Sequence, residues 1–224
     1  MDSEKIINSK IYSFFDWLWK LFVLNTLTLI TSLLIVTILP SLSACYASIK
    51  DFKDSNDNKF IFKTYFSNFK KLFKKSFIIG IIFIILFALF GYAISYYSLL
   101  AQAENFKLDT SGVIIYIFYY FSVFLLIMIF ILFNQMPMAF TYFNFRFKDN
   151  FKFCFLIGFK YLWKSFLIVL GWVIAFVLFF ITMTLPIWFF FGISIPMYNT
   201  FRNMGPIYNY LIKNKNDVQI IEEE

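Results

Sequence analysis

The sequence contains no histidine and only two cysteines, Cys45 and Cys154. Histidine is the most frequent general acid–base residue and the most frequent metal ligand, so chemistry that depends on an imidazole is excluded. The chain also lacks a glycine-rich phosphate loop, which is the usual motif for ATP hydrolysis. We therefore expect a protein that is not an enzyme and that uses no cofactor or metal ion.

Charged residues are also scarce, at 15% of the 224 positions, whereas hydrophobic residues make up 61%. A soluble domain of this length needs a charged surface, and its composition is normally the reverse. Three tracts contain no charge at all, between Lys75 and Glu104, between Asp109 and Arg146, and between Lys164 and Arg202. A helix needs about 20 apolar residues to cross the hydrocarbon core, so each tract holds a membrane span.

These tracts predict an all-α, polytopic membrane helical bundle that forms a single membrane domain over residues 1–224. The last tract is too long for one span, and Thr182 to Pro186 offers a turn at its midpoint because proline interrupts the helical hydrogen bonds. A proline also closes the first predicted span at Pro40. We expect five transmembrane helices, at 21–39, 77–100, 113–136, 163–181 and 185–203.

The positions of lysine and arginine predict the orientation of these spans, because loops rich in them stay in the cytoplasm. The loops after the first and third spans are rich in lysine, whereas the other two connections carry one lysine or none. Five spans then place the C-terminus in the cytoplasm and the N-terminus outside. The pI near 9.2 fits inward-facing loops beside anionic lipids, and we do not expect a nucleic-acid partner.

Two segments in the predicted cytoplasmic loops have the pattern of basic amphipathic helices that lie at the membrane interface, 59–75 and 151–164. In the first, apolar residues recur every three or four positions and lysines occupy most of the other side. This side could meet anionic lipids or a cytoplasmic partner, and it comprises Lys63, Lys70, Lys71, Lys74 and Lys75.

Similar short motifs in the two halves indicate a parallel internal repeat of 21–100 and 113–181, with a further half-unit at 185–203. Each copy has a proline at the end of a span (Pro40, Pro137), then Phe-Lys-Asp, then Lys-Ser-Phe at re-entry into the membrane. Superposition of the two segments would test whether they descend from one unit.

Few polar side chains fall inside the predicted spans, and the notable ones are Asn25, Thr28, Asn134 and Gln135. Residues of this kind commonly form hydrogen bonds between membrane helices. The alternative is a polar lining for a small neutral solute, which requires that they converge on one cavity.

Several short motifs lie between Trp17 and Phe77. Trp17 and Trp19 precede Leu24-Asn25, and Thr37-Ile38-Leu39-Pro40 follows. The small residues 43–47 then lead to Lys50, and Tyr65-Phe66 with Phe69-Lys70 ends the segment. With these motifs the sequence resembles the YesL-like family of bacterial membrane proteins, a domain of unknown function. The sequence departs from the family at Ser41-Leu42-Ser43 and at Leu27-Thr28.

The resemblance implies a multi-pass protein of the bacterial cytoplasmic membrane, often encoded beside sugar ABC-transport systems, with no established catalytic residues. We expect a non-enzymatic accessory component of carbohydrate uptake that contacts ABC transporter subunits or copies of itself. Two alternatives stay open, a passive permease or channel for a small neutral solute and an immunity or envelope-stress membrane protein.

Overall fold

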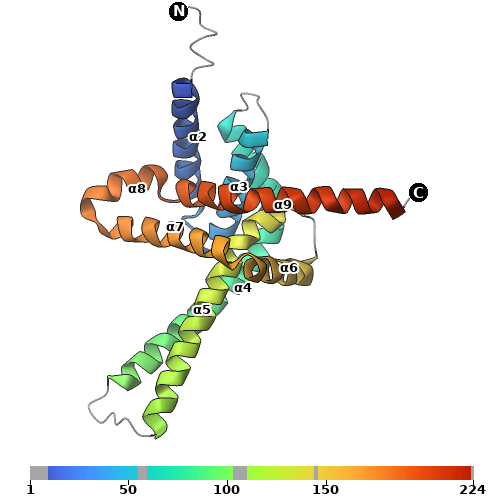
Figure 1. The fold of residues 1–224 in the computed structure, drawn as a ribbon. Coiled ribbons are helices and arrows are strands. Elements are labelled where there is room, and N and C mark those ends of the chain that lie inside the picture. Colours follow the sequence, from blue (N-terminus) through green and yellow to red (C-terminus); the bar gives the residue numbers. More distant parts are fainter. Residues whose placement is uncertain (1–9, 55–59, 103–109, 144–145, 223–224) are drawn as a thin grey trace, which may run out of the picture.

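The computed structural model describes residues 10–54, 60–102, 110–143 and 146–222, and all regular structure within them is helical (Figure 1). The all-α class predicted from the sequence is confirmed. In chain order the elements are α2 (Lys10–Thr31), η1 (Ile35–Thr37), α3 (Ile38–Asp54), α4 (Ile61–Ala101), α5 (Thr110–Tyr142), α6 (Phe147–Lys160), α7 (Leu162–Phe180), η2 (Thr182–Thr184), α8 (Leu185–Phe191) and α9 (Ser194–Glu222).

Three of the described helices are long and apolar enough to cross a membrane, and they are α4, α5 and α7. They cover the second and third predicted spans completely and the fourth up to Phe180, so the apolar helices predicted there are present. Helix α5 continues past Pro137, which lies inside it, whereas the sequence predicted that the span ends there. The chain is therefore a candidate multi-pass membrane protein.

The first predicted span, 21–39, is wrong because the chain reverses direction within it. Helix α2 ends at Thr31, a short turn follows, and α3 begins at Ile38. The two helices are antiparallel, since Lys53 near the end of α3 lies over the ring of Trp17 near the start of α2, 4.3 Å from its centroid. Proline is accepted in the first turn of a helix, where its missing N–H has no partner to lose, so Pro40 marks the start of α3.

This hairpin removes the basis for placing the N-terminus outside, because that prediction counted one crossing at 21–39. The chain turns back, so that Lys20 of α2 lies over the ring of Phe52 and Lys53 of α3 lies over the ring of Trp17. The tip of the hairpin is apolar and exposed, with 81% of Leu33 and 67% of Leu34 accessible. Residues 1–9 lie outside the described residues.

The fifth predicted span, 185–203, is also not one helix. The predicted turn at Thr182 to Pro186 is present as η2 and the start of α8. However, α8 ends at Phe191, and α9 begins at Ser194 after a break at Gly192 and Ile193. As in α3, a proline (Pro196) occupies the third position of the helix that follows the break.

Of the two predicted interfacial helices, the first is not a separate element, whereas the second is present as α6 with bounds shifted toward the N-terminus. The first, 59–75, is the beginning of α4, which runs for 41 residues into the apolar segment. One side of it packs on α3, where Tyr65 and Leu72 are buried, while Phe62 and Phe66 are exposed. The second, 151–164, comprises most of α6 and the start of α7, with a bend at Tyr161.

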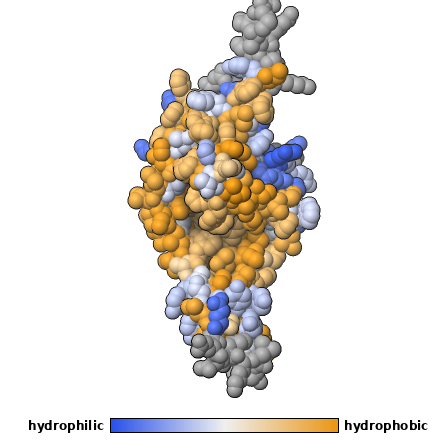
Figure 2. All heavy atoms as spheres, turned by 90° about the vertical axis from the view of Figure 1, so that its left-hand side faces the viewer, coloured by the Kyte–Doolittle hydropathy of each residue, from blue (hydrophilic) through white to orange (hydrophobic). Residues whose placement is uncertain are grey.

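Two apolar arms project from a common core (Figure 1). One arm is the antiparallel pair α4 and α5, in which Phe83 and Phe87 pack edge-to-face against Phe133. The other consists of α7 and α8, and it points in a different direction. Figure 2, seen from the side to which α8 projects, shows apolar residues over most of this face with hydrophilic residues at both ends. This distribution suits a protein surrounded by lipid.

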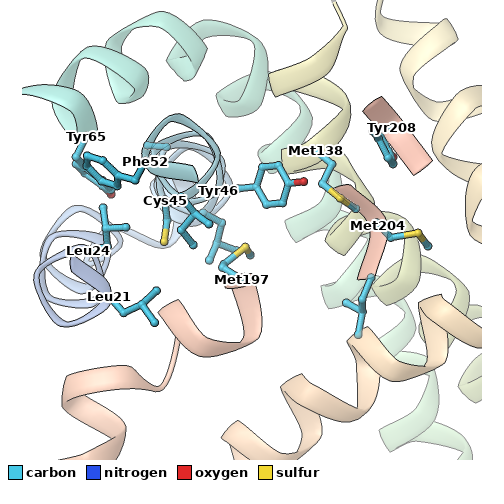
Figure 3. Close-up of a cluster of buried hydrophobic side chains, with 14 of the residues drawn as sticks. Leu21, Leu24, Cys45, Tyr46, Phe52, Tyr65, Met138, Met197, Met204 and Tyr208 are labelled. Carbon is cyan, nitrogen blue, oxygen red and sulfur yellow. The ribbon is translucent and has the colours of Figure 1, made fainter. Parts of the chain in front are cut away.

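The core lies where α2, α3 and α9 meet the other helices. Figure 3 shows side chains from α2, α3, α4, α5 and α9 that converge there, among them Leu24, Cys45, Tyr46, Met197 and Tyr208. Each of these five residues is fully buried. Helix α3 is the centre of this core, because an unbroken run from Leu39 to Ile49 is buried.

The two segments of the predicted repeat differ in the setting of their prolines. Pro40 follows a break and opens α3, whereas Pro137 lies within the continuous α5. Their Lys-Ser-Phe motifs also differ in setting, with Ser76 inside α4 and Ser165 in the first turn of α7. The duplication stays a prediction.

Candidate functional site

Asn25 lies at the break between α8 and α9, and its side chain is completely buried. Its Nδ2 donates a hydrogen bond to the carbonyl oxygen of Phe189 (2.6 Å), and its Oδ1 accepts from the backbone N–H groups of Ile193 (2.8 Å) and Ser194 (2.9 Å). In an unbroken helix the N–H of Ile193 would bond directly to the carbonyl of Phe189. The Asn25 amide is inserted into that bond, which opens the helix while both backbone groups remain paired.

A second polar cluster closes the turn between α2 and α3. The hydroxyl of Thr37 donates to the carbonyl of Thr31 (2.6 Å), and that of Thr31 lies 2.6 Å from the hydroxyl of Tyr65 on α4. Thr28 donates to the carbonyl of Leu24, one turn earlier in α2 (2.7 Å). Backbone groups left unpaired in an apolar medium cost several kcal/mol each, roughly, so this cluster allows the chain to reverse beside lipid.

Asn134 and Gln135 lie on α5, and their hydrogen bonds do not lead to those of Asn25 or Thr28. Asn134 donates to the carbonyl of Phe130 in its own helix (2.8 Å). Gln135 lies 3.4 Å from both the hydroxyl of Ser165 on α7 and that of Tyr208 on α9. The four predicted polar residues therefore do not form one hydrogen-bonded network, which a common solute path would favour.

Of the five lysines predicted as a lipid or partner surface, all but Lys75 lie on the exposed side of α4. Lys63, Lys70, Lys71 and Lys74 are exposed, and Lys75 is half-buried. The opposite side is fixed by Asn68, whose Nδ2 donates to Asp51 Oδ2 (2.8 Å) and to Ser48 Oγ (3.2 Å) on α3. Lys63, Lys70 and Lys74 are spaced so that they share one helix face, which we call the lysine stripe.

Aromatic rings enclose a lysine at the base of the α2–α3 hairpin, a feature that sequence reasoning missed. Lys53 Nζ lies 4.3 Å from the centroid of the Trp17 ring and 5.7 Å from that of Tyr198 on α9. The two rings are 5.4 Å apart. Cation–π contacts of this kind contribute about 0.5–2 kcal/mol each, so they join α2, α3 and α9. No spacing in the sequence connects these three residues.

The buried thiols and phenols of the core are poor acids and nucleophiles. Burial raises the pKa of Cys45 to about 12, against a smaller lowering from a hydrogen bond with Thr28. Burial likewise raises the pKa of Tyr46 and of Tyr208 well above their usual range. All three groups therefore remain protonated at neutral pH, where a reactive cysteine would need to be a thiolate.

The part of the chain that the structure describes contains no group of three or more histidine, cysteine, aspartate or glutamate side chains placed to hold a metal ion. The polar atoms of the core are instead amides and hydroxyls bound mainly to backbone carbonyl and N–H groups. Such groups can stabilise an unusual backbone path, but they offer no strong acid, base or nucleophile.

Residues 15–94 match a family described as a protein of unknown function, DUF624. The matched stretch runs from α2 through most of α4 and contains the segment on which the predicted resemblance rests. The YesL-like name for this family stays a prediction. No curated protein and no solved structure matches the chain.

Proposed function

We propose that this chain is a non-enzymatic accessory protein of the bacterial cytoplasmic membrane that binds a carbohydrate uptake system of the ABC type. The observation that carries the non-enzymatic part is Asn25, the fully buried amide whose oxygen and nitrogen are both bonded to backbone atoms of α8 and α9. A buried polar group occupied in this way holds a shape. It is not free to bind a substrate.

Two features support binding to a partner protein, the lysine stripe and the family resemblance. Lys63, Lys70 and Lys74 are exposed on a helix whose other side is anchored to α3 through Asn68. A cationic face on an anchored helix can attract an acidic partner surface, because complementary charge steers association and fixes orientation. The carbohydrate system as the partner follows from the resemblance alone.

Cross-linking in intact membranes, followed by purification in mild detergent and identification of the bound chains, tests the proposal. Subunits of a carbohydrate ABC transporter should co-purify with the full chain. The variant Lys63→Glu/Lys70→Glu/Lys74→Glu should lose most of them, because its cationic face becomes anionic. The matched control is Lys148→Glu/Lys152→Glu/Lys160→Glu, which reverses exposed lysines on α6 and should retain the transporter.

Absence of transporter subunits from the cross-linked wild-type chain would refute the proposal. Equal recovery from both triple variants would show that the partner binds elsewhere than the lysine stripe. In that case only the docking surface would need revision.

A further inference from the structure

A groove runs between α7 and α9. It is far in the sequence from the lysine stripe of α4. Its volume is about 470 Å³, within the range of small-molecule sites in proteins. Three of its lining residues are exposed apolar side chains, Leu170 (43%), Ile174 (51%) and Ile195 (49%). One of its walls is α7, which is long and apolar enough to span the membrane.

Gly171 lines the groove, and its lack of a side chain lets Asn199 of α9 approach α7 closely. A Cβ atom at this position would lie 2.7 Å from Nδ2 of Asn199, too close for any real contact. Asn199 uses that same Nδ2 to donate to the carbonyl of Leu167 (3.1 Å), and Asn203 donates in turn to Asn199 Oδ1 (2.7 Å). The bond from Asn199 to Leu167 joins α9 to α7 along the polar half of the groove, and Asn203 orients the Asn199 amide from within α9.

One end of the groove is cationic. Arg202 lines it, and Lys164 lies one turn before Leu167 on the same face of α7. The antiparallel pairing of Leu167 with Asn199 places Lys164 and Arg202 at the same level. Neither forms an ion pair with another residue that the structure describes.

The other end of the groove is apolar and continues into a smaller hollow of about 80 Å³. Ala175, Leu178, Trp188 and Gly192 line this hollow, which shares Gly171 with the groove. From Leu167 to Leu178 the helix rises about 16 Å at 1.5 Å per residue. That length is close to half of the roughly 30 Å hydrocarbon core, which is the depth of one leaflet.

We propose that this groove is a binding site for one anionic phospholipid of the cytoplasmic leaflet. Arg202 and Lys164 bind the phosphate of the headgroup, and an acyl chain lies along Gly171 toward Trp188. A cationic end joined to an apolar channel one leaflet deep is complementary to a phospholipid in both charge and length. The phosphate favours Arg202 because a guanidinium can donate two parallel hydrogen bonds.

Native mass spectrometry of the full chain in a non-ionic detergent tests the site. The probes are phosphatidylglycerol, which is anionic, and phosphatidylcholine, which is zwitterionic, with identical acyl chains. We expect one tightly bound phosphatidylglycerol and a preference over phosphatidylcholine. Arg202→Gln should weaken phosphatidylglycerol binding about fivefold, which is the effect of one cation near an anionic membrane surface.

Arg146→Gln is the matched control, because Arg146 is exposed and lies outside the groove. It should bind phosphatidylglycerol as the wild type does. Ile174→Trp fills the groove from an exposed position and should reduce binding of both lipids. Equal binding of the two lipids, or unchanged binding by Arg202→Gln, would overturn the proposal. These outcomes do not depend on a transporter partner.

Discussion

At the scale of single residues, the buried polar side chains mostly form hydrogen bonds with backbone groups that have no helical partner. Asn25 pairs three backbone groups that lose helical partners where α8 gives way to α9. Thr37 serves the end of α2 in the same way, through the carbonyl of Thr31. These side chains lower the free-energy cost of a broken helix beside lipid, where no water is present to pair the freed backbone groups.

Replacement of Asn25 by leucine should destabilise the protein by at least about 2 kcal/mol. Leucine has a similar volume, but it leaves the carbonyl of Phe189 and the N–H groups of Ile193 and Ser194 without partners. Thermal unfolding in detergent measures the loss. Asn209→Leu is the control, because Asn209 is exposed on α9, and it should change stability by no more than about 0.5 kcal/mol. Equal effects of the two substitutions would contradict this role of Asn25.

At the scale of elements, the hairpin of α2 and α3 packs against α4 through a small residue. Gly80 of α4 faces the start of α3, where an added Cβ would lie 3.3 Å from Cβ of Leu39. Gly91, further along the same helix, has nothing within 4 Å of an added Cβ. The two glycines therefore differ in packing while they share a helix.

Gly80→Val should destabilise the protein by about 1–3 kcal/mol, because a branched side chain would force α3 away from α4. Gly91→Val should be neutral or slightly stabilising, since valine has a higher helix propensity than glycine. Denaturation followed by circular dichroism in detergent gives both values. If Gly80→Val were as stable as Gly91→Val, close packing at the hairpin tip would not matter.

The sequence was sufficient where an element is defined by composition and insufficient where it is defined by contacts. Tracts without charge located α4, α5 and α7, and Thr182 to Pro186 located the turn before α8. The break after Thr31 was missed because residues 32–39 contain no glycine, proline or charge and are apolar apart from Ser32 and Thr37. Pro40 was assigned to the end of a helix, although proline is equally suited to a first turn.

The candidate sites show the same limit more strongly. Asn25 was singled out as a polar residue in an apolar segment, but its partners are 164–169 residues away in the chain. The groove beside Gly171 depends on the antiparallel pairing of α7 with α9, which periodicity within either helix does not reveal.

At the scale of the whole molecule, the hairpin changes the expected path of the chain through the membrane. Because α2 and α3 are antiparallel, the described start of α2 lies on the same side as the start of α4. Helices α4 and α5, which are antiparallel, are both long and apolar enough to cross a membrane, so we expect α4 to cross it and α5 to return. In Figure 1 the α4–α5 arm leaves the core on the side away from the start of α2, whereas the α7–α8 arm projects sideways.

Cysteine labelling in cells tests this path. Ser13→Cys on α2 and Ser67→Cys on α4 introduce thiols at exposed positions, as does Gln102→Cys at the far end of α4. We expect a membrane-impermeant maleimide added outside to label only Gln102→Cys. The native Cys45 and Cys154 should stay silent because both are buried. Labelling of Ser13→Cys from outside would restore a single crossing before α3.

The contact between Asn25 and the α8–α9 junction also sets an order of events during biosynthesis. Ribosomes add roughly 5–20 residues per second, and the partners of Asn25 come 164–169 residues later. The first hairpin must therefore wait on the order of ten to thirty seconds before its central amide is paired. During that interval it depends on water, lipid headgroups or the insertion machinery, so slowed translation of the segment before α8 should expose nascent chains to proteolysis.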